Sequence, residues 1–146
     1  HRESLDFVLH FVNRVCVLSG ERFKLLDLVV EHEFFFARNI DMTKVRIKVK
    51  YPMTFAIDDD VYHVHFTYLG KVTRKVKGLG TVRCLKFSAG LLAGEVFKSD
   101  SDLDIYISDD LNRIPVMFGA PILVGSVEGR LSACKGLKYA FSSLES

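Results

Sequence analysis

Tryptophan is absent from this sequence, proline and cysteine each occur only three times, and there is no long run of apolar residues. A membrane-spanning helix needs about 18 or more consecutive apolar residues, so none is expected. The cysteines, Cys16, Cys84 and Cys134, lie far apart and form no CxxC pair or other spacing typical of structural zinc. We expect buried free thiols that act as small apolar residues. A Cys16–Cys84 or Cys84–Cys134 bridge is the alternative in an oxidising compartment.

Neither sign of charge dominates, because 20 lysines and arginines stand against 18 aspartates and glutamates, a net charge of +2. A field this balanced does not indicate a nucleic-acid partner. The densest basic run, Lys71 to Lys77, is typical of a solvated strand and turn. Charge therefore excludes little beyond a strongly basic binding surface.

The length of 146 residues predicts a single domain spanning residues 1–146. With 49% hydrophobic and 26% charged residues, the composition is that of a folded globular chain rather than a disordered one. Twelve phenylalanines and no tryptophan indicate a core of Phe, Val, Ile and Leu. A chain of this size buries enough surface to need neither a metal nor a disulfide for its stability.

Apolar residues alternate along much of the chain, most clearly at Tyr62, Val64, Phe66 and Tyr68, which is typical of strands. Gly, Asp or Asn occupies most of the intervening connections, and several short strands separated by such turns predict an antiparallel meander. We expect strands over residues 5–12, 45–57, 61–69, 72–77, 81–88, 96–97, 103–108, 113–118 and 122–131.

A hairpin is expected where Asp58-Asp59-Asp60 joins two of these strands, and its second arm of nine residues is about 30 Å long. Such long strands suit a barrel better than a small sandwich. The best helix candidate is Leu25 to Phe36, capped by Asp27 and broken at residues 37–41. The prediction is a mainly β fold: an antiparallel meander forming an open or closed β-barrel, with one short helix near the N-terminus.

Two glycine-containing segments are predicted to be turns: Ser19-Gly20-Glu21 and Gly78-Leu79-Gly80. The second is not a nucleotide-binding loop, because no helix follows to present its N-terminus to a phosphate. A third segment, Gly125 to Gly129, places a serine between glycines, but it lacks the spacing and the strand-to-helix turn of a nucleophile elbow. Within it, Glu128 and Arg130 are expected to form an exposed pair on one strand face.

Metal chemistry has little support in the pattern. His63 and His65 share one strand face, yet nothing aims carboxylates at them, and a solvent-facing position is the better interpretation. The acidic residues between Asp100 and Asp110 lack the spacing of a calcium loop. We therefore predict no catalytic residues, no metal site, no cofactor and no enzymatic activity.

The aromatic content of the strands leaves two alternatives open. A barrel of this size has an interior that either packs solid or leaves a cavity for one small ligand. Phe66, Tyr68 and Phe97 are the candidate ligand-binding residues in the second case. The sequence does not decide between a solid core and a cavity.

From about Asp27 onward, an ordered set of short motifs resembles a family of exported bacterial proteins known only as a domain of unknown function. The motifs lie at residues 36–41, 55–62, 68–71, 94–97, 107–116, 124–127 and 135–139. The resemblance implies a barrel-like β fold, a setting in the periplasm or outer envelope of a Gram-negative bacterium, and no known catalytic residues. The chain itself has no signal peptide and is expected to be a processed form or a fragment lacking upstream strands.

Two hypotheses for function follow. The first is a non-catalytic binding domain of the cell envelope that holds an apolar ligand or lipid. The alternative is a structural or assembly protein that contacts an envelope protein through exposed strand edges. Neither involves nucleic acid or a membrane-spanning segment.

Overall fold

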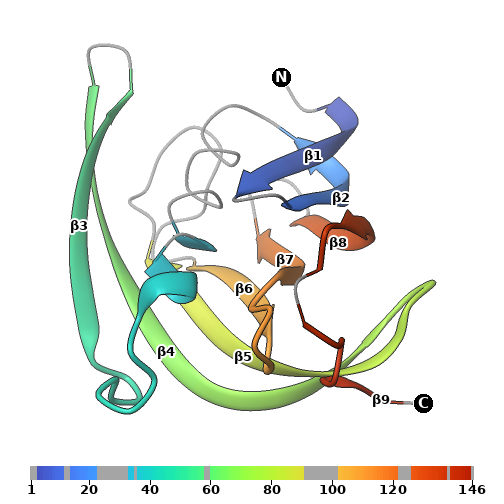
Figure 1. Ribbon diagram of the computed structural model, residues 1–146. Coiled ribbons are helices and arrows are strands. Elements are labelled where there is room, and N and C mark those ends of the chain that lie inside the picture. The colour runs from blue at the N-terminus through green and yellow to red at the C-terminus, as the bar shows by residue number, and fades with distance from the viewer. Residues whose placement is uncertain are drawn as a thin grey trace.

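A nine-stranded antiparallel sheet makes up most of the structure (Figure 1). The computed structural model describes residues 3–11, 14–22, 33–34, 36–57, 60–90, 102–121, 126–137 and 139–145. The strands are β1 (Glu3–Phe11), β2 (Arg14–Arg22), β3 (Lys50–Ile57), β4 (Asp60–Val76), β5 (Gly80–Gly90), β6 (Asp102–Ser108), β7 (Pro115–Pro121), β8 (Ser126–Lys135) and β9 (Leu144–Glu145).

The strand order explains how the predicted meander is extended. It runs β1-β2-β8-β7-β6-β5-β4-β3, so the strands from β3 to β8 are each paired with their neighbours in sequence. The β1–β2 hairpin adds to the free side of β8, and β9 pairs with one end of β5. The mainly β, antiparallel meander is therefore confirmed. In the described part of the chain β1 and β3 are not paired with each other, and the sheet is open.

The longest strand, β4, joins two hairpins. It pairs with β3 from Asp60 to Thr67 and with β5 from His65 to Val76. The sequence predicts two strands here, but they form one, because a bulge between Tyr68 and Gly70 takes up the extra residue. Gly70 has a φ of +105°, which a residue without a Cβ adopts at little cost. Figure 1 shows this strand curving beneath the rest of the molecule.

A short helix, described at residues 33–34 and 36–39, packs one aromatic side chain against three strands. The ring centroid of Phe36 lies 5.5 Å from that of Tyr51 in β3, 5.0 Å from Phe66 in β4 and 6.2 Å from Phe87 in β5. Tyr68 adds a further contact to Phe87 at 5.2 Å. These rings form a packed core between the helix and this part of the sheet.

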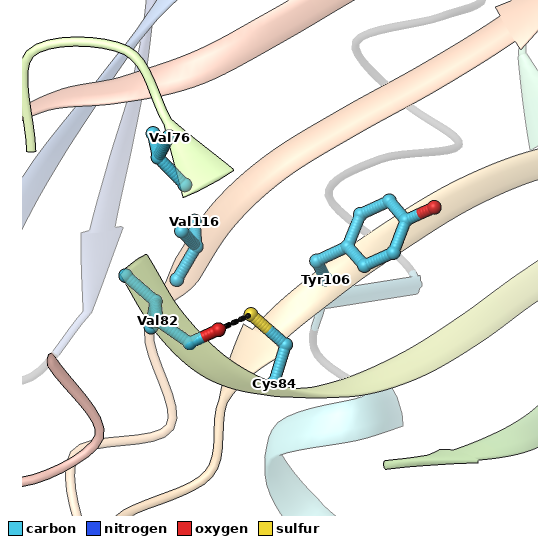
Figure 2. Packing of buried hydrophobic residues seen from close by; sticks show 5 residues of the cluster. All are labelled: Val76, Val82, Cys84, Tyr106 and Val116. Carbon is cyan, nitrogen blue, oxygen red and sulfur yellow. Dashed lines mark hydrogen bonds between the residues drawn. The ribbon is translucent and has the colours of Figure 1, made fainter. Parts of the chain in front are cut away.

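A second core lies on the other face of β5, because residues an odd number apart in a strand point to opposite faces and Cys84 is three residues from Phe87. Figure 2 shows its buried members, which belong to β4, β5, β6 and β7. Both faces of β5 are thus covered, which explains its nearly continuous burial. The buried residues of this second core are Val76, Val82, Cys84, Tyr106 and Val116.

The sequence pattern predicts a turn where the structure has a strand, and it does not reveal two of the strands. Ser19-Gly20-Glu21 is not a turn but part of β2, a strand that the sequence pattern did not reveal. Gly20 pairs with Leu5 of β1 on one side and with Gly129 of β8 on the other. Pairing on both sides overrides the local turn preference of this segment. The two-residue strand β9 was also missed.

The predicted helix end was wrong by three residues, since residues 37–39 are helical. The amide of Ile40 still donates to the Phe36 carbonyl at 3.0 Å. Asp41 then begins a new turn, in which its Oδ1 accepts hydrogen bonds from the Thr43 amide and hydroxyl. These two hydrogen bonds lower the pKa of Asp41. Residues 25–32 of the predicted helix, and the predicted strand at residues 96–97, lie outside the described residues.

The expectation of buried free thiols is confirmed for Cys84 and wrong for Cys134. Cys84 is a free, fully buried thiol, so neither of the alternative bridges exists, since both include it. Its burial raises the pKa of the thiol to about 12. Cys134 is disulfide-bonded. The register places Cys16 of β2 directly opposite Cys134 of β8, and directly opposed Cα atoms are within disulfide reach.

Within the described ranges, no helix is long and apolar enough to cross a membrane.

The ring of Phe118 lies over Gly129, its partner across β7 and β8. A Cβ at position 129 would clash with this buried ring. We predict that Gly129→Ala lowers the free energy of unfolding by about 1–3 kcal/mol, measured by urea denaturation, because the clash forces the ring or strand to move. Glu128→Ala, at the exposed neighbouring position, is the control and changes stability little. Equal effects of the two substitutions would contradict this packing.

Candidate functional site

A pocket of about 300 Å³ opens where three segments of the chain meet. One wall is the turn between β4 and β5, the second is β8, and the third is the C-terminal segment, described at residues 136–137 and 139–145. The lining residues are Lys77, Gly78, Leu79, Arg130, Leu131, Ser132, Cys134, Leu137 and Phe141.

The turn at the tip of β4 and β5 confirms the predicted Gly78-Leu79-Gly80 turn. The amide of Leu79 donates to the carbonyl of Val76 at 3.0 Å, and both glycines have positive φ values, +83° and +125°. These values favour glycine over any other residue. The side chain of Leu79 packs against both apolar clusters at this end of the sheet, which positions the turn against the pocket.

Asn112 holds the C-terminal wall in place. Its Nδ2 donates to the carbonyls of Tyr139 at 3.0 Å and Ala140 at 3.2 Å, and its Oδ1 accepts from the Tyr139 amide at 3.0 Å. Asn112 is 1% exposed, so water does not compete for these bonds. A single amide side chain therefore holds Tyr139 and Ala140, which belong to no strand, against the β6–β7 connection.

Asp110 links the β6–β7 connection to the same segment. Its Oδ1 accepts from the Ser108 hydroxyl at 2.8 Å and from the amides of Asn112 and Arg113 at 2.9 and 3.2 Å. Its Oδ2 accepts from the hydroxyl and amide of Ser143 at 2.8 and 3.4 Å. Five donors thus converge on one carboxylate, which ties the connection to the chain 33 residues later.

Two arginines extend these contacts. Arg83 of β5 donates from a guanidinium nitrogen to the Ser142 carbonyl at 3.1 Å, and its amide donates to the Ser143 carbonyl at 2.8 Å. Arg113 donates to the Ile40 carbonyl at 2.8 Å, just beyond the short helix. The motif at residues 107–116 therefore has a structural explanation: it joins the helix, the sheet and the pocket wall.

The pocket combines an apolar floor with a positive rim. Leu79, Leu131, Leu137 and Phe141 belong to one apolar cluster around Ile114 and Leu131. Lys77 and Arg130 are exposed, and none of the lining residues that the structure describes carries a carboxylate. Among the residues that the structure describes, neither cation has an ion-pair partner.

The contact that Arg130 makes differs from the one predicted from the sequence. Arg130 was expected to pair with Glu128, but its Nε donates to the carbonyl of Lys77 at 3.1 Å, across 53 residues of chain. This bond places the Arg130 guanidinium beside the turn that carries Lys77, and both residues line the pocket. No local pattern signals it, because Lys77 lies in the β4–β5 turn and Arg130 in β8, far apart in sequence.

The predicted ligand-binding residues lie elsewhere. Phe66 is fully buried against Phe36, and Tyr68 is 6% exposed against Phe87, so both belong to the aromatic core. Two effects raise the pKa of Tyr68: burial is the larger, and the negative charge of Asp109 is the smaller. Phe97 lies outside the described residues. The assignment of these three residues to a ligand stays a prediction, and neither Phe66 nor Tyr68 lines the pocket formed by the β4–β5 turn, β8 and the C-terminal segment.

The two histidines of β4 have separate environments. His63 Nδ1 lies 2.9 Å from the Thr54 hydroxyl of β3. The ring of His65 covers Gly90, its partner in β5, so closely that a Cβ there would touch it. In the described ranges, no three His, Cys, Asp or Glu side chains gather in a way that could hold a metal ion.

Asp110 and its neighbour Asp109 allow a test of the hydrogen-bond network around Asp110. We predict that Asp110→Ala lowers the free energy of unfolding by about 2–3 kcal/mol, because five hydrogen bonds lose their acceptor. The control, Asp109→Ala, removes only a surface ion pair with Lys71 at 3.4 Å and costs at most about 1 kcal/mol. Urea denaturation measures both. A larger loss for Asp109→Ala would contradict the network.

Comparison with known proteins assigns the chain to a protein family by its sequence. Neither a curated protein nor a solved structure matches it with significant similarity. A family model described as "Protein of unknown function (DUF3108)" matches residues 24–132, which include β3 to β7, most of β8, and Asp110 with its partners in the β6–β7 connection. The chain therefore belongs to this family, the domain of unknown function DUF3108.

Proposed function

We propose that this protein is a non-catalytic binding domain of the bacterial cell envelope that holds an apolar ligand or lipid. The observation that carries the proposal is the pocket between the β4–β5 turn, β8 and the C-terminal segment. Its floor is formed by leucine and phenylalanine side chains, which favour an apolar guest.

The pocket's walls are fixed independently of any ligand. Asn112 and Asp110 bind the C-terminal segment through buried and half-buried hydrogen bonds, and Arg130 braces the turn. A preformed site loses less conformational entropy on binding than a site that must first order itself. At about 300 Å³ the pocket lies at the small end of the range for ligand sites. It suits a small molecule or one end of a longer chain.

The lining also favours binding over catalysis. Its ionisable groups are the cations Lys77 and Arg130, and its cysteine, Cys134, is disulfide-bonded and therefore not a nucleophile. The pocket has no histidine or carboxylate in position to act as a general base toward Ser132.

An exported location is part of the proposal. Structural disulfides persist in oxidising compartments such as the periplasm and are rare in the cytosol, and Cys134 is disulfide-bonded. The family resemblance adds the periplasm or outer envelope of a Gram-negative bacterium. In this setting the fold would act as an open, barrel-like half-shell.

A second candidate function is contact with an envelope protein through a strand edge. β3 is the last strand of the described sheet and pairs only with β4. Its other edge is therefore available for a further strand. Lys50 and Pro52 are exposed on β3, and both residue types discourage edge-to-edge pairing. This edge supports the assembly role less well than the pocket supports binding.

Native mass spectrometry of gently purified protein, followed by organic extraction, tests the proposal. We predict a reproducible extra mass that extracts into the organic phase. Leu137→Glu, which places a charge on the pocket floor, should remove most of it, because burying a carboxylate against apolar groups is costly. Leu111→Glu, at an apolar position that is 75% exposed and outside the pocket, is the control and should retain it. A clean apo mass with defined oligomers would instead favour the strand-edge role.

A further inference from the structure

We infer that the ligand of this pocket is a single-chain anionic amphiphile, a fatty-acid-like carboxylate, whose head is bound by Lys77 and Arg130. The inference rests on the proposed binding function and adds the chemical class of the ligand. Its basis is the combination of two cations with an apolar floor in one small pocket.

Arg130 is held in a position suited to a carboxylate. Its Nε donates a hydrogen bond to the Lys77 carbonyl oxygen at 3.1 Å, which fixes the position of the guanidinium. Its two Nη atoms have no hydrogen-bond partner among the described residues. A planar guanidinium with free terminal donors matches the geometry of a carboxylate, and anchoring lowers the entropy lost when the ligand binds.

Lys77 adds a second positive charge from the adjacent turn. Both residues line the pocket, the backbone of Lys77 is bonded to the Arg130 side chain, and none of the described lining residues is acidic. Two positive charges that share one pocket repel each other, and a bound anion offsets that repulsion. A neutral hydroxyl can accept a hydrogen bond from either cation, but it lacks the charge–charge attraction that a carboxylate adds.

The apolar side of the pocket supplies the second half of the recognition. Leu79, Leu131, Leu137 and Phe141 pack together beneath the rim and offer a surface for a hydrocarbon chain. The volume of about 300 Å³ equals roughly ten water-sized units. That is room for a carboxylate and part of one acyl chain, but not for a lipid with two chains.

Isothermal titration calorimetry of the unmodified protein with dodecanoate and with 1-dodecanol, both below their aggregation limits, tests this inference. We expect dodecanoate to bind at least about 10-fold more tightly at low salt, and the difference to shrink at about 0.5 M salt because exposed charges are screened. Lys77→Gln and Arg130→Gln should each weaken dodecanoate binding by about 3- to 10-fold without changing the affinity for dodecanol. Lys75→Gln removes the same charge from an exposed site outside the pocket and should change neither.

The outcomes separate this inference from the function on which it rests. Equal affinity for the two probes, with no effect of Arg130→Gln, would overturn the anionic head group while leaving an apolar binding site. Binding to anionic phospholipid vesicles without binding of dodecanoate would assign the cations to a membrane surface and also overturn the inference. Binding of neither probe nor vesicle by a folded protein would contradict the binding function itself. Amide NMR shifts of Gly78 and Leu79 on titration identify the pocket as the site in the supporting case.

Discussion

The organisation of this protein depends on the hydrogen bonds that Asp110 and Asn112 make to the C-terminal segment. Without them, residues 139–143 would have only the short β9 pairing and the Arg83 contacts to hold them against the sheet. With them, Phe141 and Leu144 cover the core around Val82 and Cys84, and Leu137 and Phe141 become a pocket wall. A network of this kind is stabilising when its donors and acceptors are satisfied, and it specifies one arrangement of the chain. The same residues thus serve the core and the candidate site.

The two faces of β5 show how one sheet supports both the core and the candidate site. One face carries the aromatic core with the short helix, and the opposite face carries the cluster of Figure 2. Phe66 and Tyr68 are needed for the first of these cores, so their burial is explained by packing alone. The pocket lies beyond the second core, at the tip of the β4–β5 hairpin, where the sheet is no longer covered on all sides. The pocket of about 300 Å³ thus lies at one end of the apolar layer.

Most of the fold was predictable from the sequence because alternation and turn residues are local signals. The strands from β3 to β8, the Gly78-Leu79-Gly80 turn and a short helix all follow from them. β2 was missed because Gly20 suggests a turn, whereas pairing with β1 and β8 keeps it extended. The pocket could not be predicted, since Lys77, Arg130 and Phe141 meet only through tertiary pairing. The resemblance to a family was visible in the motif at residues 107–116, but its role as an anchor required the hydrogen-bond partners, which lie 27 to 33 residues away.

Native-state amide hydrogen exchange tests the central claim most directly. The amide of Tyr139 lies on an exposed residue of a segment outside the strands, yet it donates to the buried Asn112 side chain at 3.0 Å. Its exchange should therefore be slowed to a degree comparable with the amides of β5, and Asn112→Ala should abolish that protection while leaving the β4–β5 ladder protected. If the Tyr139 amide exchanged in the unaltered protein as fast as an unstructured peptide, the C-terminal segment would not be anchored. The account of the pocket as a preformed site would then be contradicted.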